Sequence, residues 1–243
     1  MDQPAAGGTE YAEYLLIDDL LRLQCPLTPG ADDELLFIVV HQVYELWFKL
    51  LLAELSRARD LLAASDANAA VGLLQRVSRI DRLLVEQLAV LETMSPDEFL
   101  RFRDPLAPAS GFQSRQFRAI ERISGDAGDG GGGLWDAFCA CGRGLGLDLP
   151  AGEEPLARSA RLAALAGLYH EHRAPGRAAL HRVAELLLDH DETIAAWRFR
   201  HTLMAARAIG SRPGTGGSKG VGYLRGTIDQ RFFPELWEVR NRL

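Results

Sequence analysis

Cysteine is scarce in this sequence of 243 residues, in which Cys25, Cys139 and Cys141 are the only three. Three cysteines cannot all pair with one another, so the disulfide framework of a small secreted domain is not expected. One residue separates Cys139 from Cys141, whereas zinc knuckles and thioredoxin motifs have two residues between their cysteines. The cysteine pattern therefore favours a reducing compartment.

An excess of basic charge is also missing, because 27 Lys and Arg stand against 33 Asp and Glu and give a formal net charge of −6. Nucleic-acid-binding proteins usually carry a basic face, so we expect no nucleic-acid partner. Charged residues interrupt the long apolar stretches, from which we expect no membrane span. The N-terminus has no basic region followed by an apolar one, so no secretory signal is predicted and a cytoplasmic location is expected.

Strand patterns are absent as well, since no alternation of Val, Ile, Thr and aromatic residues with hairpin turns occurs in the sequence. Helical patterns fill the interval from Gly30 to Pro96, with one break at residues 65–68. Residues 35–55 are apolar on nearly all sides, as expected of a helix surrounded by protein, and residues 73–91 carry one apolar stripe. These patterns predict an antiparallel helical hairpin within an all-α bundle.

Shorter helical patterns occupy the rest of the chain. We expect helices over residues 9–24, through Phe99 and Phe102, over 113–123, three between 134 and 190, and then over 191–209 and 223–236. Gly210 is expected to end the helix before it, and the glycine-rich stretch 125–133 is expected to be a flexible loop. No internal repeat is present, and residues 1–243 are predicted to form a single all-α domain.

The glycine-rich segment 214–222 raises the question of a phosphate-binding loop, because glycines allow backbone N–H groups to converge on an anion. A Walker loop requires Gly-Lys followed by Ser or Thr, whereas this segment has Ser218-Lys219-Gly220. The pattern before it is also helical, while phosphate loops follow a strand. We therefore expect no nucleotide site there.

Histidine is the most informative residue type for chemistry. His41 and His201 each lie inside an apolar helical pattern, where an imidazole needs a hydrogen bond or a metal. Taken alone, each is most simply a hydrogen-bonded core histidine. Two such histidines on different helices of a bundle can also ligate and face a cofactor between the helices. Neither a Ser-His-Asp order nor an HExxH zinc motif can be assembled from the sequence.

Four sequence segments closely resemble the tryptophan 2,3-dioxygenase family. They are LFIVVHQVYELWFKLLLAEL over residues 36–55, FRDPLAPASGFQSRQFRAIE over 102–121, WRFRH over 197–201, and IGSRPGTGGSKGVGYL with RFFPELWEVR within 209–240. They occur in the family's order, and the resemblance covers roughly residues 9–123 and 189–240. It is weak over residues 124–188, where the chain is shortened.

The resemblance implies an all-α fold, usually in a homotetramer, with one heme b held between the helices of each subunit. By motif position, His201 of WRFRH resembles the proximal ligand of the heme iron. His41 of the His-Gln pair resembles the distal residue beside the indole nitrogen of the substrate. The heme iron of the active form is expected to be ferrous, with one axial position open to O2.

The residues that contact the substrate are also implied by the resemblance. Arg103 would pair with the substrate carboxylate, a group that suits a bidentate guanidinium. Thr215 would contact the amino and carboxylate groups, and Gly214 would allow close approach of the backbone. Phe37 and Phe99 would form walls of the indole pocket.

The N-terminal segment has an implied role in a neighbouring subunit. Tyr11, Tyr14 and Leu15 resemble the residues that reach into the site of that subunit. Oligomerisation would then complete the site.

The implied reaction adds O2 across the indole C2–C3 bond of L-tryptophan to give N-formyl-L-kynurenine, in tryptophan catabolism by the kynurenine pathway. One departure bears on the substrate, because the chain has Asp32-Asp33-Glu34 where family members usually show His-Asp-Glu. A related heme-dependent oxygenase acting on a substituted tryptophan, with insertion of one oxygen atom, is therefore the second hypothesis. A helical heme-binding or scaffold protein without enzymatic activity is the third.

Overall fold

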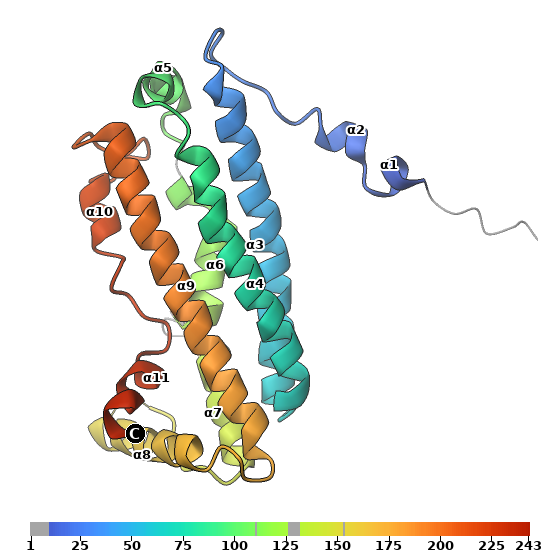
Figure 1. Cartoon of the computed structure of the whole chain (residues 1–243), viewed down its shortest axis with the longest axis vertical. Helices are drawn as coiled ribbons and strands as arrows, with labels where there is room; N and C mark the ends of the chain where they lie inside the picture. Colours follow the sequence, from blue (N-terminus) through green and yellow to red (C-terminus); the bar gives the residue numbers. More distant parts are fainter. Residues whose placement is uncertain (1–9, 110, 126–131, 153) are drawn as a thin grey trace, which may run out of the picture.

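The body of the molecule is a set of long helices. The computed structural model describes residues 10–109, 111–125, 132–152 and 154–243. Over these residues the chain consists of helices and connecting segments without a strand, which confirms the all-α prediction. The three longest helices lie side by side in the order α3 (Asp33–Ala63), α4 (Ala67–Leu91) and α9 (Arg177–Ile209) (Figure 1).

α3 and α4 form the antiparallel hairpin that the sequence predicts, with the turn at residues 64–66. Asp66 acts as the N-cap of α4, because its carboxylate accepts a hydrogen bond from the Ala69 backbone N–H at 3.0 Å. The apolar stripe of α4 is buried from Leu73 to Leu91, and α4 packs against both α3 and α9. Burial of one leucine side chain contributes about 1.5–3 kcal/mol, so this stripe is a main source of the hairpin's stability.

α9 is a single helix of 33 residues, so the predicted boundary at residues 190–191 is wrong. Asp191 does not begin a helix. Its buried carboxylate accepts hydrogen bonds from the backbone N–H groups of Phe232 and Phe233 and from Trp237 Nε1, at 3.1, 3.2 and 2.9 Å. Asp191 therefore binds a segment far away in the sequence and does not act as a helix N-cap. Gly210 follows the last residue of α9, as predicted.

The C-terminal segment differs from the single helix predicted over 223–236. It contains α10 (Val221–Arg225) and α11 (Pro234–Glu238), separated by a non-helical stretch, and ends in a 3-10 helix (Val239–Arg242). Asp191 anchors the end of the non-helical stretch through Phe232 and Phe233 and the following α11 through Trp237. This tertiary contact overrides the local helical pattern.

The remaining helices agree closely with the prediction. They are α5 (Pro96–Leu106), a 3-10 turn (Gly111–Gln113), α6 (Arg115–Ser124), α7 (Leu134–Gly144) and α8 (Pro155–His170). α7, α8 and the first part of α9 are the three helices expected between residues 134 and 190. The loop expected over 125–133 lies mainly outside the described residues.

The N-terminal segment projects away from the helical body (Figure 1). The helix expected over 9–24 is instead two short helices, α1 (Tyr11–Tyr14) and α2 (Ile17–Leu20), and residue 9 lies outside the described residues. The break falls at Leu16, whose φ of +50° does not belong to an α-helix. Neither helix contains a buried residue, so the described part of the chain leaves their apolar side chains uncovered.

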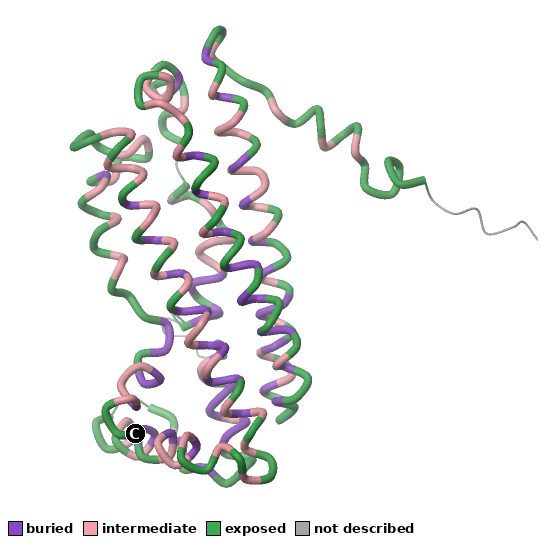
Figure 2. The backbone as a smooth tube through the Cα atoms, in the orientation of Figure 1, coloured by how far each residue is buried: buried purple, intermediate pink, exposed green. Residues whose placement is uncertain are grey.

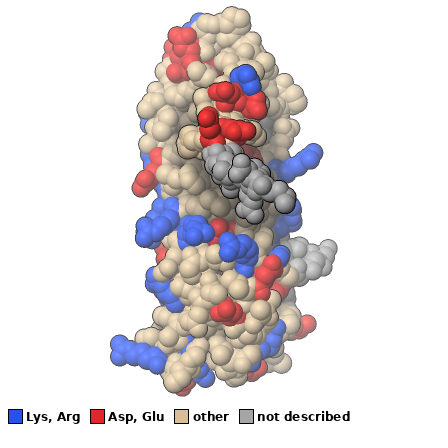
Figure 3. All heavy atoms as spheres, turned by 90° about the vertical axis from the view of Figure 1, so that its right-hand side faces the viewer, with Lys and Arg blue, Asp and Glu red and all other residues tan. Residues whose placement is uncertain are grey.

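The outer face of α3 is more exposed than its apolar pattern predicts. Leu35, Val39, Leu46 and Leu50, here called the outer α3 stripe, are 48, 40, 51 and 38% exposed. Figure 2 shows exposed positions along α3, and in Figure 3 uncharged side chains predominate in the upper half of this side. The prediction that protein surrounds this helix is therefore wrong for a single chain.

α3 also bears on the expectation that no apolar stretch could cross a membrane. By length and composition alone, α3 is long and apolar enough to cross a membrane. The expectation that charged residues interrupt every such stretch is therefore wrong for α3. Its opposite side packs against α4, α6 and α7. In this fold α3 packs along one side of the bundle, with its outer face exposed.

A row of three buried, hydrogen-bonded polar side chains connects α4, α6 and α9. Ser124 Oγ lies 2.9 Å from His190 Nε2, and His190 Nδ1 lies 2.7 Å from Asp81 Oδ2, with none of the three residues more than 1% exposed. Burial raises the pKa of Asp81, an effect that His190 opposes. Sequence analysis found no Ser-His-Asp order because these residues occur as Asp, Ser and His along the chain. None of them lines the cavity described below, so these hydrogen-bonded side chains link the three helices to one another.

Candidate active site

One cavity of about 340 Å³ lies between α3, α4, α5, α6 and α9, with residues 214–227 on a further side. Seven of the site residues expected from the resemblance line it: Phe37, His41, Phe99, Arg103, His201, Gly214 and Thr215. They come from three helices and one loop that are far apart in the sequence. Only the tertiary fold brings them to a common space.

His41 faces the cavity from α3. Its Nδ1 lies 2.7 Å from the Phe37 carbonyl oxygen, one turn earlier in the helix. A carbonyl oxygen can only accept a hydrogen bond, so Nδ1 carries the hydrogen and Nε2 keeps a lone pair in the neutral ring. Burial lowers the pKa of His41, and the Phe37 carbonyl and the nearby Glu45 partly offset this effect. The ring is therefore a neutral hydrogen-bond acceptor toward the cavity.

His201 faces the same cavity from α9. Burial, aided by the charge of His41 when that ring is protonated, lowers the pKa of His201 to about 4. Its imidazole forms no hydrogen bond within the part of the chain that the structure describes. A neutral imidazole without a hydrogen-bond partner is available to ligate a metal.

Arg103 extends from α5 into the cavity, and its side chain is only 15% exposed. Nη2 donates to the Pro213 carbonyl oxygen at 2.5 Å, and Nη1 lies 3.3 Å from an Asp104 carboxylate oxygen. Nε is buried and lacks a hydrogen-bond partner among the described residues. An unpaired buried donor is costly, so a carboxylate ligand would stabilise this guanidinium.

Thr215 and Gly214 belong to the glycine-rich loop that borders the cavity. The Thr215 hydroxyl donates to the Ala109 carbonyl oxygen at 2.7 Å, which ties this loop to the end of α5. A Cβ on Gly214 would lie 2.5 Å from Ser218 Oγ, so a side chain there would require the Ser218 hydroxyl to rotate away. The glycines shape this loop, as the failed Walker spacing indicated, without forming a nucleotide motif.

Phe37 and Phe99 form part of an aromatic wall. Their ring centroids are 5.9 Å apart, and both rings pack against the buried Phe102 at 5.6 and 5.4 Å. Phe37 also packs on the His41 ring, with 4.0 Å between the centroids. The Phe37 ring is thus part of the apolar packing around His41, whose burial lowers its pKa.

The N-terminal residues of the expected site lie apart from this cavity. Tyr11, Tyr14 and Leu15 are 77, 75 and 42% exposed and do not line it. Within one chain the structure therefore does not bring them to the other site residues.

Sequence analysis did not single out Tyr44 and Trp197, which both line the cavity. The Trp197 ring is parallel to the His201 ring, and Tyr44 donates a 2.7 Å hydrogen bond to the Leu84 carbonyl oxygen. Burial raises the pKa of Tyr44 to about 12, so its hydroxyl stays protonated. Helical spacing could have identified both residues. Tyr44 lies almost one turn after His41, and Trp197 lies one turn before His201, so each shares a helix face with one of the two histidines.

A charged group on the cavity wall was also missed. The Glu121 carboxylate accepts hydrogen bonds from Arg198 Nη2 at 2.9 Å and from Arg118 Nη1 at 2.5 Å. The carboxylate is thus held between a guanidinium group of α6 and one of α9 on the cavity wall.

The fold and the cavity define a class of protein: a helical bundle that holds a ligand between its helices, with two neutral imidazoles facing the site. Comparison with known proteins identifies the family within this class. A family model described as tryptophan 2,3-dioxygenase matches residues 2–129 and 147–243. The chain therefore belongs to the tryptophan 2,3-dioxygenase family, a family of oxidoreductases, which confirms the resemblance seen in its four sequence segments.

Individual relatives extend over almost the whole chain. It is 44% identical to a tryptophan 2,3-dioxygenase of Nocardioides sp., over 96% of this chain and 94% of that protein. It is 40% identical to a tryptophan 2,3-dioxygenase of Anaeromyxobacter dehalogenans, with both chains fully covered. A tryptophan 2,3-dioxygenase of Caulobacter vibrioides is 39% identical over 98% of this chain and all of its own length.

We expect the ligand-free protein to lose stability as the pH falls from about 6.5 toward 4, in part because of His201. An unfolded histidine takes up its proton near pH 6.5, whereas the buried ring does so near 4. In this window the unfolded state binds more protons and is favoured as the pH falls. Urea unfolding at a series of pH values measures the slope, which His201→Leu should flatten and Met204→Leu, a cavity-lining control on α9, should preserve. Equal slopes for His201→Leu and the wild type would contradict this origin.

Proposed function

We propose that this protein is a heme-dependent tryptophan 2,3-dioxygenase, which adds both atoms of O2 across the indole C2–C3 bond of L-tryptophan to give N-formyl-L-kynurenine. The family assignment supports the reaction class. The observation that carries the proposal is one cavity that combines two neutral imidazoles, His41 and His201, with the unpartnered buried Nε of Arg103.

The residues of the cavity fit heme b. His201 would ligate the heme iron through its neutral imidazole, and the guanidinium groups of Arg118 and Arg198 on the cavity wall suit the carboxylates of a heme. Among the described residues no group of three or more His, Cys, Asp or Glu could hold a metal ion. A metal in this cavity would thus need ligands of its own, as heme iron has. When bound, heme b would supply a ferrous iron that activates O2.

His41 orients the indole in this proposal. Its Nδ1 hydrogen is committed to the Phe37 carbonyl, so Nε2 accepts the indole N–H. Accepting this hydrogen bond fixes the plane of the ring and raises its electron density, which favours attack at the C2–C3 bond. Because burial lowers the pKa of His41, the ring is a neutral acceptor at neutral pH.

Arg103 and Thr215 position the amino acid part of the substrate. The carboxylate would pair with the Arg103 guanidinium and give its buried Nε a partner. Thr215, which is hydrogen-bonded to Ala109, would offer its hydroxyl oxygen to the ammonium group. A substrate without either group would leave these polar atoms unpaired in a desolvated place, which is the basis of specificity.

Two contacts join α5 and the segment that follows it to the glycine-rich loop. They are the hydrogen bonds from Arg103 to Pro213 and from Thr215 to Ala109. Both donors also belong to the proposed carboxylate and ammonium site. Substrate binding would therefore involve the side chains that hold this loop in place.

We propose further that copies of the chain assemble, as a tetramer in the form that the family resemblance implies. Two uncovered apolar surfaces support assembly: the outer α3 stripe and the N-terminal segment with Tyr11, Tyr14 and Leu15. A second copy could cover both, because the N-terminal segment projects away from its own bundle (Figure 1). The three residues would then help to enclose the neighbour's cavity.

A cytoplasmic location is also proposed. Cys25, Cys139 and Cys141 are free thiols in the structure. Unpaired cysteines are typical of reducing compartments.

The alternative of a substituted tryptophan substrate was raised by the departure at Asp32-Asp33-Glu34. Residues 32–34 do not line the cavity. Glu34 is fully buried, and its carboxylate accepts hydrogen bonds from the backbone N–H groups of Leu27 and Thr28, each at 2.8 Å. The departure therefore concerns the entry into α3 and gives no support to a different substrate.

The proposed reaction is tested by the origin of the product's oxygen atoms. The heme-loaded protein is reduced without oxygen, given L-tryptophan and then exposed to isotopically heavy O2. Mass analysis should find two heavy oxygen atoms in N-formyl-L-kynurenine. One heavy atom, or product only from a substituted tryptophan, would favour the alternative oxygenase, and no turnover with any indole would favour a heme-binding protein without enzymatic activity.

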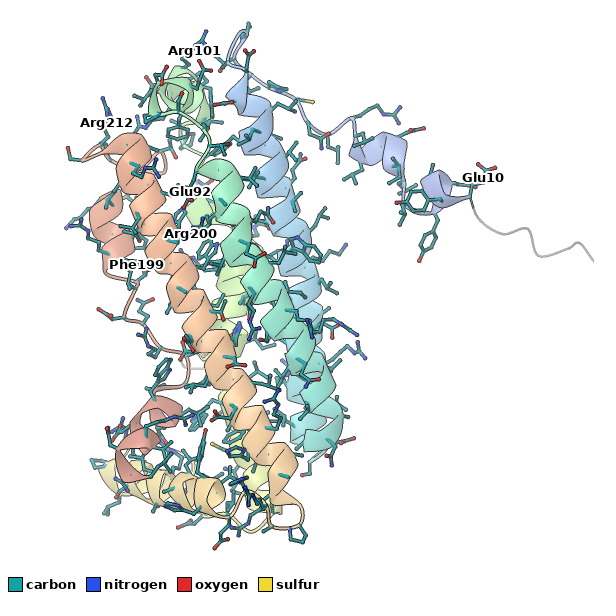
Figure 4. The ribbon with its side chains drawn as sticks, viewed as in Figure 1. Glu10, Glu92, Arg101, Phe199, Arg200 and Arg212 are labelled. Atoms are coloured by element: carbon teal, nitrogen blue, oxygen red, sulfur yellow. The ribbon has the colours of Figure 1, made fainter. Side chains whose placement is uncertain are left out.

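Arg103→Leu should weaken L-tryptophan binding to the heme-loaded protein by about 10- to 100-fold, because a charged hydrogen bond contributes roughly 1.5–3 kcal/mol. Binding of indole, which has no carboxylate, should change little. Spectroscopic titration measures both affinities. Arg101→Leu is the matched control, since Arg101 lies on the same helix, is exposed and pairs with Glu98 (Figure 4). Equal losses for both ligands would remove Arg103 from carboxylate recognition.

Leu46→Asp together with Leu50→Asp should shift the assembled protein toward the monomer, since two charges would enter the apolar contact on α3. Sedimentation velocity gives the mass of the assembly. Leu156→Asp is the control, because Leu156 is 86% exposed on α8 and lies outside both proposed surfaces. A double variant with the wild-type mass, or a monomeric wild type, would overturn the proposed interface.

A further inference from the structure

The WRFRH segment contains a second residue that acts on the cofactor site. We propose that Trp197 is a positioning residue for His201, and that its indole holds the imidazole plane in the orientation from which it ligates iron. This inference rests on the proposed heme-binding function. Trp197 would act through His201 without bonding to iron itself.

The two rings are stacked. Trp197 and His201 are one helical turn apart on α9, their planes differ by 2°, and their centroids are 5.3 Å apart. Parallel aromatic rings at this separation attract each other in an offset arrangement. The parallel alignment therefore defines one favoured plane for the imidazole.

His201 needs such support because the usual device is missing. A metal-ligating histidine almost always donates its other ring N–H to a carbonyl or carboxylate, which fixes the plane of the ring. His41 has this kind of partner in the Phe37 carbonyl, whereas the described residues provide none for His201. Stacking on Trp197 is the contact that remains to restrict rotation of the imidazole.

Trp197 is itself held in place by other helices. Its ring packs against Phe117 of α6 at 5.2 Å and against the Tyr44 ring of α3 at 6.2 Å, edge to face. Its Nε1 lies 3.4 Å from the Tyr44 hydroxyl oxygen, and that hydroxyl donates to the Leu84 carbonyl of α4. Three other helices thus restrain the indole, α3 and α6 directly and α4 through Tyr44, and through the indole they restrain the imidazole.

The neighbouring residues of the segment have other partners, which provides a matched control. Arg198 pairs with Glu121 of α6, and Arg200 pairs with Glu92 of α4 (Figure 4). Phe199 lies between them in sequence, is 52% exposed and does not line the cavity. Loss of its ring should therefore leave the heme site unchanged.

The experiment measures heme binding and the iron–histidine bond, both without turnover. Apoprotein of the wild type, Trp197→Phe, Trp197→Leu and Phe199→Leu is titrated with heme by absorbance. The iron–imidazole stretching band of each ferrous protein is then recorded by resonance Raman. Trp197→Leu should bind heme about 10- to 100-fold more weakly and show a shifted or broadened band, as expected when support of a metal ligand is lost.

Trp197→Phe should restore most of the affinity and a sharp band, because a phenyl ring still stacks on the imidazole. Phe199→Leu should match the wild type in both measurements. Circular dichroism checks that each apoprotein is folded, and Trp197→Met replaces Trp197→Leu under the same expectation where the leucine variant does not fold. A merely structural role for Trp197 would alter stability without moving the Raman band.

The outcomes separate this inference from the proposed function. Wild-type affinity and an unchanged iron–imidazole band in folded Trp197→Leu or Trp197→Met would overturn the positioning role, while heme binding by the wild type and its loss in His201→Ala would leave the proposed function standing. A wild-type protein that binds no heme through His201 would overturn both.

Discussion

Desolvation of two imidazoles is the constraint on which the rest of the site depends. His41 and His201 lie where burial lowers both pKa values, so both rings are neutral at neutral pH. A neutral ring keeps a lone pair, with which it accepts an indole N–H or ligates iron, whereas a protonated ring can do neither. The aromatic walls that remove water from these rings therefore serve the chemistry as well as the packing.

Charged side chains of α9 hold this helix in place, so that His201 faces the same cavity as His41 of α3. Arg200 pairs with Glu92 of α4, Arg198 pairs with Glu121 of α6, and Asp191 binds the backbone of the C-terminal segment. Each of these groups is partly or fully buried and would be costly without its partner. The helix is thus crosslinked on three sides, and small rotations that would turn its imidazole away from the cavity are resisted.

The single chain leaves two apolar surfaces without cover, the outer α3 stripe and the N-terminal segment. Both would be removed from water by the same event, the docking of another copy. The family resemblance assigns Tyr11, Tyr14 and Leu15 of that segment to a neighbour's site, and their distance from their own cavity agrees with this. Assembly and completion of the site would then be one process.

The local sequence pattern by itself determined much of the secondary structure of this protein. The α3–α4 hairpin, the buried stripe of α4 and the helix end at Gly210 follow from periodicity and backbone restrictions that act within a few turns, and motif resemblance found seven residues of the cavity. Only the tertiary structure decided that α9 continues through Asp191, that Trp197 stacks on His201, and that Arg103 keeps a buried donor without a partner. These features depend on contacts between segments far apart in sequence, whose free energy outweighs the local preferences that a sequence pattern expresses.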